Sequence, residues 1–182
     1  LYPAPSAEPM LAALQRRRSI RHFSDELPAR AAIQHALDGA AYAPSGKNDH
    51  RNRWIVVYGR EKVEALYRLV LDWAEPVEHY KHLIWLARKG IDPVTCGASC
   101  LIIGYNRPDA LNPQDDTVIA TVLAEQLLAE SGLGTCWSGY FRTAAQESPA
   151  IQQALGLPEG YRVYSVLMVG VPTERYPNIP YR

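Results

Sequence analysis

A cluster of arginines near the N-terminus is the feature of this sequence with the clearest chemical potential. Arg16, Arg17, Arg18 and Arg21 lie within six residues, together with the hydroxyl of Ser19. A guanidinium group binds phosphate oxygens through paired hydrogen bonds, and a serine hydroxyl adds another donor. The cluster therefore indicates a phosphate site. A solvated basic helix end, where arginines also interact favourably with the helix dipole, is the alternative explanation of the same residues.

A second candidate binding element is the polar loop at 43–54, with the sequence APSGKNDHRNRW. It is expected to connect the end of a helix to a buried strand. Pro44 and Gly46 permit an unusual backbone path close to a ligand. The amide of Asn48 carries donors and an acceptor, which suits the edge of a heterocycle with alternating carbonyl and N–H groups. An ordinary polar surface loop is the alternative.

A third candidate is the glycine-rich segment at 131–140, with the sequence SGLGTCWSGY. Gly132, Gly134 and Gly139 free the backbone, so that main-chain N–H groups can face a ligand. The segment lacks the G-x-G-x-x-G spacing of a dinucleotide-binding turn, and no strand is expected before it. The alternative is a glycine that ends a helix, followed by a loop with Trp137 in the core.

Several other chemistries lack their motifs. The sequence contains no P-loop, H-E-x-x-H, C-x-x-C, G-x-S-x-G or EF-hand pattern. His79 and His82 can share one helical face, but no third ligand is placed near them, so surface histidines are favoured over a metal site. Cys96 and Cys100 are expected to be buried, reduced thiols. A nucleophilic role for Cys136 lacks a His–Asp partner.

Composition and charge restrict the class of protein. The 182 residues include 19 basic and 19 acidic side chains, and 47% of the residues are apolar. Disorder is disfavoured because disordered chains are poor in apolar residues, and nucleic-acid binding is disfavoured because it needs excess positive charge. No apolar run approaches the roughly 20 residues that span a bilayer, and no signal-peptide pattern is visible. Since three cysteines cannot all pair, we expect a cytoplasmic protein with one domain over residues 1–182.

The apolar pattern predicts strands separated by helices. Buried strands are expected at 54–58, 100–106 and 164–171. Helices are expected at 10–18, 24–46, 61–75, 77–90, 117–132 and 143–156, with Pro28 in the first turn of the second helix and Pro44 at its end. The apolar residues of the 117–132 helix are Val118, Ile119, Val122, Leu123 and Leu127. Residues 1–9 are expected to be irregular and 172–182 to form an extended arm, which leaves an α+β fold with a central sheet wrapped by helices.

Taken in order, these motifs resemble those of the FMN-dependent nitroreductase family. RRRSIRHF, APSGKN before the strand WIVV, GLGTCWSGY, LMVGVP and a C-terminal P-x-R sequence follow one another from about Arg16 to Arg182. The resemblance implies a central mixed β-sheet wrapped by helices and an intertwined homodimer, with each FMN at the interface in contact with both subunits. It also implies that NAD(P)H reduces the flavin and that a nitroaromatic, quinone or similar acceptor then takes the electrons in a ping-pong cycle.

The resemblance also assigns residues to the cofactor. The residues implied at the phosphate and the ribityl chain are Arg17, Arg18, Ser19, Arg21 and the C-terminal Arg182. The residues implied beside the isoalloxazine ring, in a loop often supplied by the partner subunit, are Pro44, Ser45, Gly46 and Asn48. The residues whose backbone N–H is implied to approach flavin N5 are Leu133, Gly134 and Thr135. No catalytic side chain is required, because flavin N5 carries the hydride chemistry.

Some positions depart from the family pattern. His50 stands where a glutamine is common, Arg51 where a proline is common, and Val171 where the family often has tyrosine. Lys47 is a candidate for the cation that stabilises reduced flavin, because of its place in the polar loop. The departures keep two alternatives open: a specialised relative that fragments flavin, removes a halogen or oxidises an azoline, and a non-catalytic flavin-binding redox protein.

Overall fold

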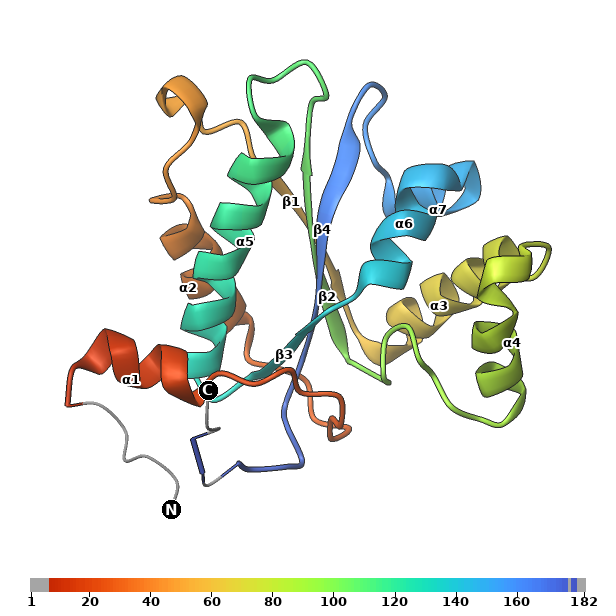
Figure 1. Cartoon of the computed structure of the whole chain (residues 1–182), viewed down its shortest axis with the longest axis horizontal. Coiled ribbons are helices and arrows are strands. Elements are labelled where there is room, and N and C mark those ends of the chain that lie inside the picture. Colours follow the sequence, from red (N-terminus) through yellow and green to blue (C-terminus); the bar gives the residue numbers. More distant parts are fainter. Residues whose placement is uncertain (1–6, 177, 180–182) are drawn as a thin grey trace.

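Four strands form a central sheet in the computed structural model, which describes residues 7–176 and 178–179 (Figure 1). The strands are β1 (Arg53–Tyr58), β2 (Cys100–Asn106), β3 (Gly134–Trp137) and β4 (Arg162–Gly170). Their order across the sheet is β1–β2–β4–β3, and all three ladders are antiparallel. The mixed character that was expected of the sheet is limited, among the described residues, to one isolated parallel bridge between Ser19 and Thr135.

Helices cover both faces of this sheet (Figure 1). On one face lie α2 (Arg30–Ala40) and α5 (Pro113–Glu130), with α1 (Pro9–Arg16) packed on α5. On the other face lie α3 (Arg60–Ala74), α4 (Lys81–Arg88), α6 (Gly139–Glu147) and α7 (Pro149–Leu155). Two single 3₁₀ turns, η1 (Gly46–Asn48) and η2 (Glu78–Tyr80), complete the described elements. The α+β class is thus confirmed.

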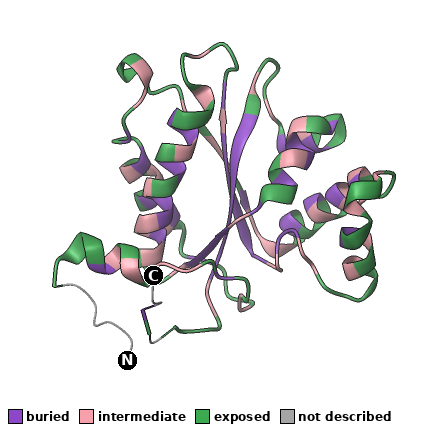
Figure 2. Cartoon of the chain, in the orientation of Figure 1, coloured by how far each residue is buried: buried purple, intermediate pink, exposed green. Residues whose placement is uncertain are grey.

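Alternating side chains of the strands divide the core into two clusters. On β4, Val166 and Met168 join the cluster under α3, α6 and α7, whereas Leu167 and Val169 join the cluster under α2 and α5. This is the two-residue period of a strand that is buried on both faces. The buried residues accordingly follow the strands and the inner faces of the helices (Figure 2).

The central helix α5 buries a different face from the one that its large apolar residues suggest. Its buried residues are Asp116, Thr117, Ala120, Thr121, Ala124, Glu125 and Leu128. Ile119 and Val122, which belong to the apolar set noted in the sequence, are 40% and 38% exposed. Small residues let the helix approach the sheet closely, and a Cβ on Gly104 of β2 would meet the Thr117 methyl at 2.6 Å.

Other boundaries differ by a few residues. The second helix begins at Arg30, so Pro28 precedes it instead of lying in its first turn. The first helix ends at Arg16, and β3 is a strand where only a loop was expected. Residues 1–6, 177 and 180–182 of the expected terminal segments lie outside the described residues. Among the described residues, no helix combines the length and apolar character needed to cross a bilayer.

Candidate functional site

The arginine segment (residues 16–21) lies directly against β3. Ser19 forms the parallel bridge with Thr135, and the Ile20 N–H donates to the Thr135 carbonyl at 2.9 Å. Just beyond the segment, Phe23 pairs with Pro172 in an antiparallel bridge. The structure therefore brings together two of the predicted site elements, at 17–21 and 133–135, and adds the residues that follow β4.

Gly134 is required by this close approach. A Cβ at position 134 would lie 2.8 Å from Cγ2 of Ile20, which is shorter than side-chain carbons normally approach. The neighbouring Thr135 is 1% exposed. Its carbonyl accepts from Ile20, and its hydroxyl donates to Glu125 Oε1 at 3.2 Å. Gly134 and Thr135, the first two residues of β3, thus support the arginine segment, and Leu133 directly precedes the strand.

A buried carboxylate, which the sequence analysis missed, connects these elements. Glu125 of α5 is 4% exposed and accepts hydrogen bonds from three residues, one in the arginine segment and two on β3. Arg17 Nη1 lies 3.4 Å and Thr135 Oγ1 3.2 Å from Oε1, and Trp137 Nε1 lies 3.1 Å from Oε2. The available signal was an acidic residue in the middle of an otherwise apolar helix, because such a group needs partners when buried.

A cavity of about 530 Å³ lies beside the arginine segment, and we call it the anchor cavity. Its charged lining residues are Arg16, Arg17, Arg18, Glu130, Glu174 and Arg175. Leu133, Gly134 and Thr135 form part of its wall. Arg18 donates to the carbonyls of Gln15 and Asn178 at 2.7 and 2.8 Å, so its guanidinium is held in place. The cavity carries more cations than anions, as a phosphate site requires.

The two remaining predicted anchor residues have different positions. Ser19 is exposed between the arginines, and Arg182 lies outside the described residues. Glu174, at the edge of the anchor cavity, accepts from the Tyr176 hydroxyl at 2.8 Å and pairs with His22. These hydrogen bonds lower the pKa of the Glu174 carboxyl, so it stays anionic.

A larger cavity of about 990 Å³ opens on the other side of the arginine segment, and we call it the large cavity. Arg21, rather than Arg17 or Arg18, lines it. Its wall also contains residues 137–140, where β3 ends and α6 begins. The first intrahelical bond of α6 runs from the Arg142 N–H to the Ser138 carbonyl at 3.1 Å, so the N–H groups of residues 139–141 precede that bond.

The glycine-rich segment of the sequence included Gly139, but the beginning of α6 was not assigned to the cofactor. A Cβ on Gly139 would meet no atom within 4 Å, so the backbone there is accessible from the cavity. Exposed N–H groups at a helix N-terminus attract electron-rich ligand atoms. The signal in the sequence was the S-G pair directly after Trp137, because serine is favoured at the N-cap of a helix.

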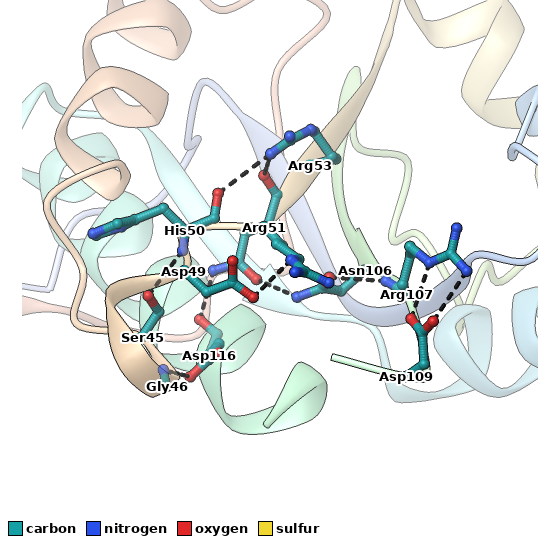
Figure 3. A network of polar contacts seen from close by, with 11 residues as sticks. Ser45, Gly46, Asp49, His50, Arg51, Arg53, Asn106, Arg107, Asp109 and Asp116 are labelled. Atoms are coloured by element: carbon teal, nitrogen blue, oxygen red, sulfur yellow. Dashed lines mark hydrogen bonds and ion pairs between the residues drawn. The ribbon is translucent and has the colours of Figure 1, made fainter. Parts of the chain in front are cut away.

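The polar loop is tied to the start of α5 instead (Figure 3). Asp116 Oδ1 accepts the Gly46 N–H at 3.0 Å, and the Asp116 carbonyl accepts from the Asn52 amide at 2.9 Å. Ser45 Oγ accepts the His50 N–H at 2.9 Å. These bonds fix the path of Pro44, Ser45 and Gly46 against the helix.

Three residues of this loop use an uncommon backbone conformation. Lys47, Asn48 and His50 have φ angles of 52°, 58° and 48°, in the left-handed region that most residues avoid. His50 Nε2 lies 2.7 Å from Asn48 Oδ1, and Asp49 pairs with Arg51 at 2.6 Å. Such strain is found where a loop must present particular groups. Here the exposed residues are Lys47, Asn48, Asp49 and His50.

Within one chain, the polar loop and the arginine segment do not lie next to each other. Asp116 holds the loop and Glu125 holds Arg17, and these residues are nine positions apart on α5, which is about 14 Å along its axis. The loop extends beyond the first turn of α5, whereas the arginine segment passes its last turn (Figure 1). Pro44, Ser45, Gly46 and Asn48 therefore form a surface separate from the two cavities.

The cysteines and histidines offer no additional centre. All three cysteines are free, and burial raises the pKa of Cys96 to about 11 and of Cys100 to about 12, with Asp92 contributing at Cys96. His82 Nε2 lies 3.1 Å from the Tyr140 hydroxyl. Within residues 7–176 and 178–179, no group of three or more His, Cys, Asp or Glu side chains is placed to hold a metal ion.

Comparisons with known proteins agree on one family. The model of the family described as Nitroreductase matches residues 14–171. A protein of Archaeoglobus fulgidus named NADH dehydrogenase/NAD(P)H nitroreductase is 27% identical over 169 residues, which cover 92% of this chain and 87% of that protein. A Bacteroides fragilis nitroreductase with bound FMN superposes with a TM-score of 0.83 at 22% identity, covering 97% of this chain and 96% of the other.

Two further solved structures share the fold at low sequence identity. An FMN-bound nitroreductase from Desulfitobacterium hafniense has a TM-score of 0.82 at 23% identity, covering 97% of this chain and 96% of the other. An iodotyrosine deiodinase bound to FMN and 3-iodo-L-tyrosine has a TM-score of 0.67 at 22% identity, covering 93% of each chain. At these identities the superpositions confirm the expected fold.

Proposed function

This chain belongs to the nitroreductase family, and we propose that it is an FMN-dependent oxidoreductase that passes electrons from NAD(P)H to a nitroaromatic, quinone or similar acceptor in a ping-pong cycle. The observation that carries this proposal is the position of the arginine segment between a basic cavity and a cavity bordered by the N-terminus of a helix. FMN needs both, because it has a phosphate at one end and a reactive ring at the other.

The residues present fit the cofactor. The phosphate belongs with Arg17 and Arg18 in the anchor cavity, where Leu133, Gly134 and Thr135 form part of the wall, and Ser19 is the exposed hydroxyl next to them in the chain. Arg182 is proposed to reach the same phosphate. Arg21 lines the large cavity and is the cation available to the ring and the ribityl chain. When bound, FMN supplies the hydride-accepting N5 atom.

At the flavin ring, the protein itself contributes hydrogen-bond donors and side chains that exclude water. We assign the donor for N5 to the N–H groups at the start of α6, because those of residues 139–141 precede the first intrahelical bond. This extends the predicted N5 site at 133–135 toward the C-terminus of β3. Trp137 and Tyr140 line the same cavity and exclude water from the reacting atoms.

A complete site requires a second copy of the chain. The polar loop is built like a binding element, with three left-handed residues and buried anchors, yet it lies away from the arginine segment. A homodimer in which the loop of one subunit covers the cofactor of the other resolves this arrangement. Exposed apolar side chains favour such an interface: Leu111 is 57%, Ile119 40% and Val122 38% exposed.

The visible spectrum and a cofactor titration test the proposal. The protein should purify yellow or take up FMN, run as a dimer on a sizing column, and oxidise NAD(P)H faster than free FMN does. Arg21→Ala should weaken FMN affinity by about 10- to 100-fold, the scale of charge-assisted hydrogen bonds. Arg68→Ala, at an exposed pair with Glu64 on α3, is the matched control. A colourless protein that binds no FMN would refute the proposal.

Subunit mixing tests the shared site. Dimers of Arg21→Ala and dimers of Asn48→Ala should each be impaired. After exchange in mild denaturant, the mixture should recover roughly a quarter of normal activity, because half of the dimers are then mixed and each has one intact site. If no activity is recovered, Arg21 and Asn48 belong to the same site within one subunit. Assays with iodotyrosine test for a specialised relative. Measurements of the rate of flavin reduction by NADH and NADPH test for a non-catalytic redox protein.

A further inference from the structure

We propose that the acceptor reduced by this protein is an aromatic molecule that carries an anionic group, and that Arg142 binds this group at the edge of the large cavity. The inference rests on the proposed function and goes beyond it by naming the chemical class of the acceptor. Three features carry it: the aromatic part of the cavity lining, the balance of charge on that lining, and the lack of a partner for Arg142 among the described residues.

Part of the lining of the large cavity is aromatic. The rings of Tyr80 and Tyr140 meet edge to face with centroids 6.3 Å apart, and His79 meets Tyr80 at 4.9 Å. Trp73 supports Tyr80 from behind with centroids 4.7 Å apart, while His82 bonds to the Tyr140 hydroxyl. Edge-to-face contacts favour planar aromatic guests. The cavity has room for such a guest beside the flavin ring, because it is at the upper end of ligand-pocket volumes.

The single carboxylate on the cavity lining, Asp92, is fully engaged by its own loop. Its Oδ1 accepts the N–H groups of Val94 and Thr95 at 2.9 and 2.8 Å. Its Oδ2 accepts the Gly97 N–H at 3.0 Å and the Thr95 hydroxyl. These four donors hold the carboxylate in the loop. Asp92 is therefore a structural carboxylate, and it forms no ion pair with a described arginine of the lining.

Arg142 is the cation that remains. It lies on the first turns of α6, two positions after Tyr140, and it lines the large cavity. Its guanidinium forms no hydrogen bond or ion pair with any described residue. The other lining arginine, Arg21, is assigned to the cofactor. A planar guanidinium beside an aromatic wall is suited to a carboxylate or another oxyanion attached to a ring.

Three acceptors that differ in charge test the inference: 4-nitrobenzoate, 4-nitrobenzamide and 4-nitrobenzylamine. The holoenzyme should have the highest kcat/KM for the anion and the lowest for the cation. Arg142→Gln should lower the ratio of kcat/KM for the anion to that for the amide by about 5- to 10-fold, since the pair is partly solvated. Most of the change should lie in KM, because the charge contact is the same in the ground and transition states.

Arg142→Lys should restore part of the ratio, and Arg68→Gln on α3 should leave it unchanged. A second readout needs no turnover: 4-hydroxybenzoate, but not 4-hydroxybenzamide, should bind the oxidised holoenzyme in a calorimetric titration, and Arg142→Gln should weaken that binding by a similar factor. A ratio that does not respond to Arg142→Gln would overturn the inference, as would a raised KM for NAD(P)H with no change in the acceptor ratio.

The outcomes separate this inference from the proposed function. A protein that binds FMN and reduces the neutral amide, but does not discriminate by charge, refutes the acceptor class alone. A protein that takes up no FMN refutes the proposed function and the inference together.

Discussion

Replacing the buried carboxylate of Glu125 is the most direct perturbation of the arrangement described above. Glu125→Ala removes the acceptor for Trp137 Nε1 at 3.1 Å and for the Thr135 hydroxyl at 3.2 Å, and it frees Arg17. We expect the free energy of unfolding of the apoprotein to fall. The reason is that two donors from β3 lose their partner in a buried environment.

The magnitude follows from the burial of each donor. An unsatisfied buried donor costs about 1–3 kcal/mol, so Trp137 and Thr135 together cost about 2–6 kcal/mol. Arg17, whose side chain is 25% exposed, can turn toward water and adds little. Deleting a buried charge also removes a desolvation cost, which offsets part of the loss. We therefore expect about 2–4 kcal/mol for Glu125→Ala and about 1–2 kcal/mol for Glu125→Gln, which keeps an acceptor oxygen.

Urea unfolding, followed by tryptophan fluorescence and by circular dichroism, measures these values. Glu130→Gln is the matched control, because Glu130 lies exposed near the end of the same helix. It should change stability by no more than about 0.5 kcal/mol. If Glu125→Ala proved as mild as this control, the hydrogen bonds to Glu125 would contribute nothing to the link between α5, β3 and the arginine segment.

Three further perturbations test other parts of the molecule. His50→Ala should lower FMN affinity by about 3- to 10-fold because Asn48 loses its 2.7 Å partner, whereas His50→Gln should restore it; equal effects in an FMN titration would contradict the pairing. Gly134→Ala should cost about 1–3 kcal/mol of stability from the 2.8 Å approach to Ile20, whereas Gly139→Ala, with open space, should unfold like the wild type. Because the folded pKa values of Cys96 and Cys100 are raised to about 11 and 12, native thiols should resist Ellman's reagent at neutral pH. For the same reason stability should decline as pH rises from about 9 toward 12, which urea unfolding across that range would reveal.

Elements with a continuous apolar pattern could be predicted from the sequence. The runs at 54–58, 100–106 and 164–171 correspond to β1, β2 and β4. β2 and β4 lie in the middle of the sheet and are buried on both faces, which needs an apolar residue at nearly every position, whereas β1 at the edge is apolar but only partly buried. β3 could not be recognised in this way. It has only four residues, Gly134–Trp137, and it is a strand because β4 pairs with one edge and Ser19 bridges to the other.

The buried face of α5 escaped prediction for a related reason. Hydrophobic periodicity identifies large apolar residues, but the sheet accepts Ala120, Ala124 and Thr117 at close range and leaves Ile119 and Val122 partly exposed. An apolar residue on a helix can face either the core of its own chain or a partner subunit. The pattern alone does not distinguish these destinations, whereas the exposed fractions do.

The separation of the two predicted halves of the site is the observation that links sequence, fold and assembly. Motif order assigns the polar loop and the arginine segment to one cofactor, but the hydrogen bonds of Gly46 to Asp116 and of Arg17 to Glu125 hold them at different levels of α5. A helix cannot shorten to join them, since its rise per residue is fixed. If both halves contact the same ligand, the loop must come from another chain. Because two copies related by a two-fold axis exchange equivalent elements, each would then complete the other's site.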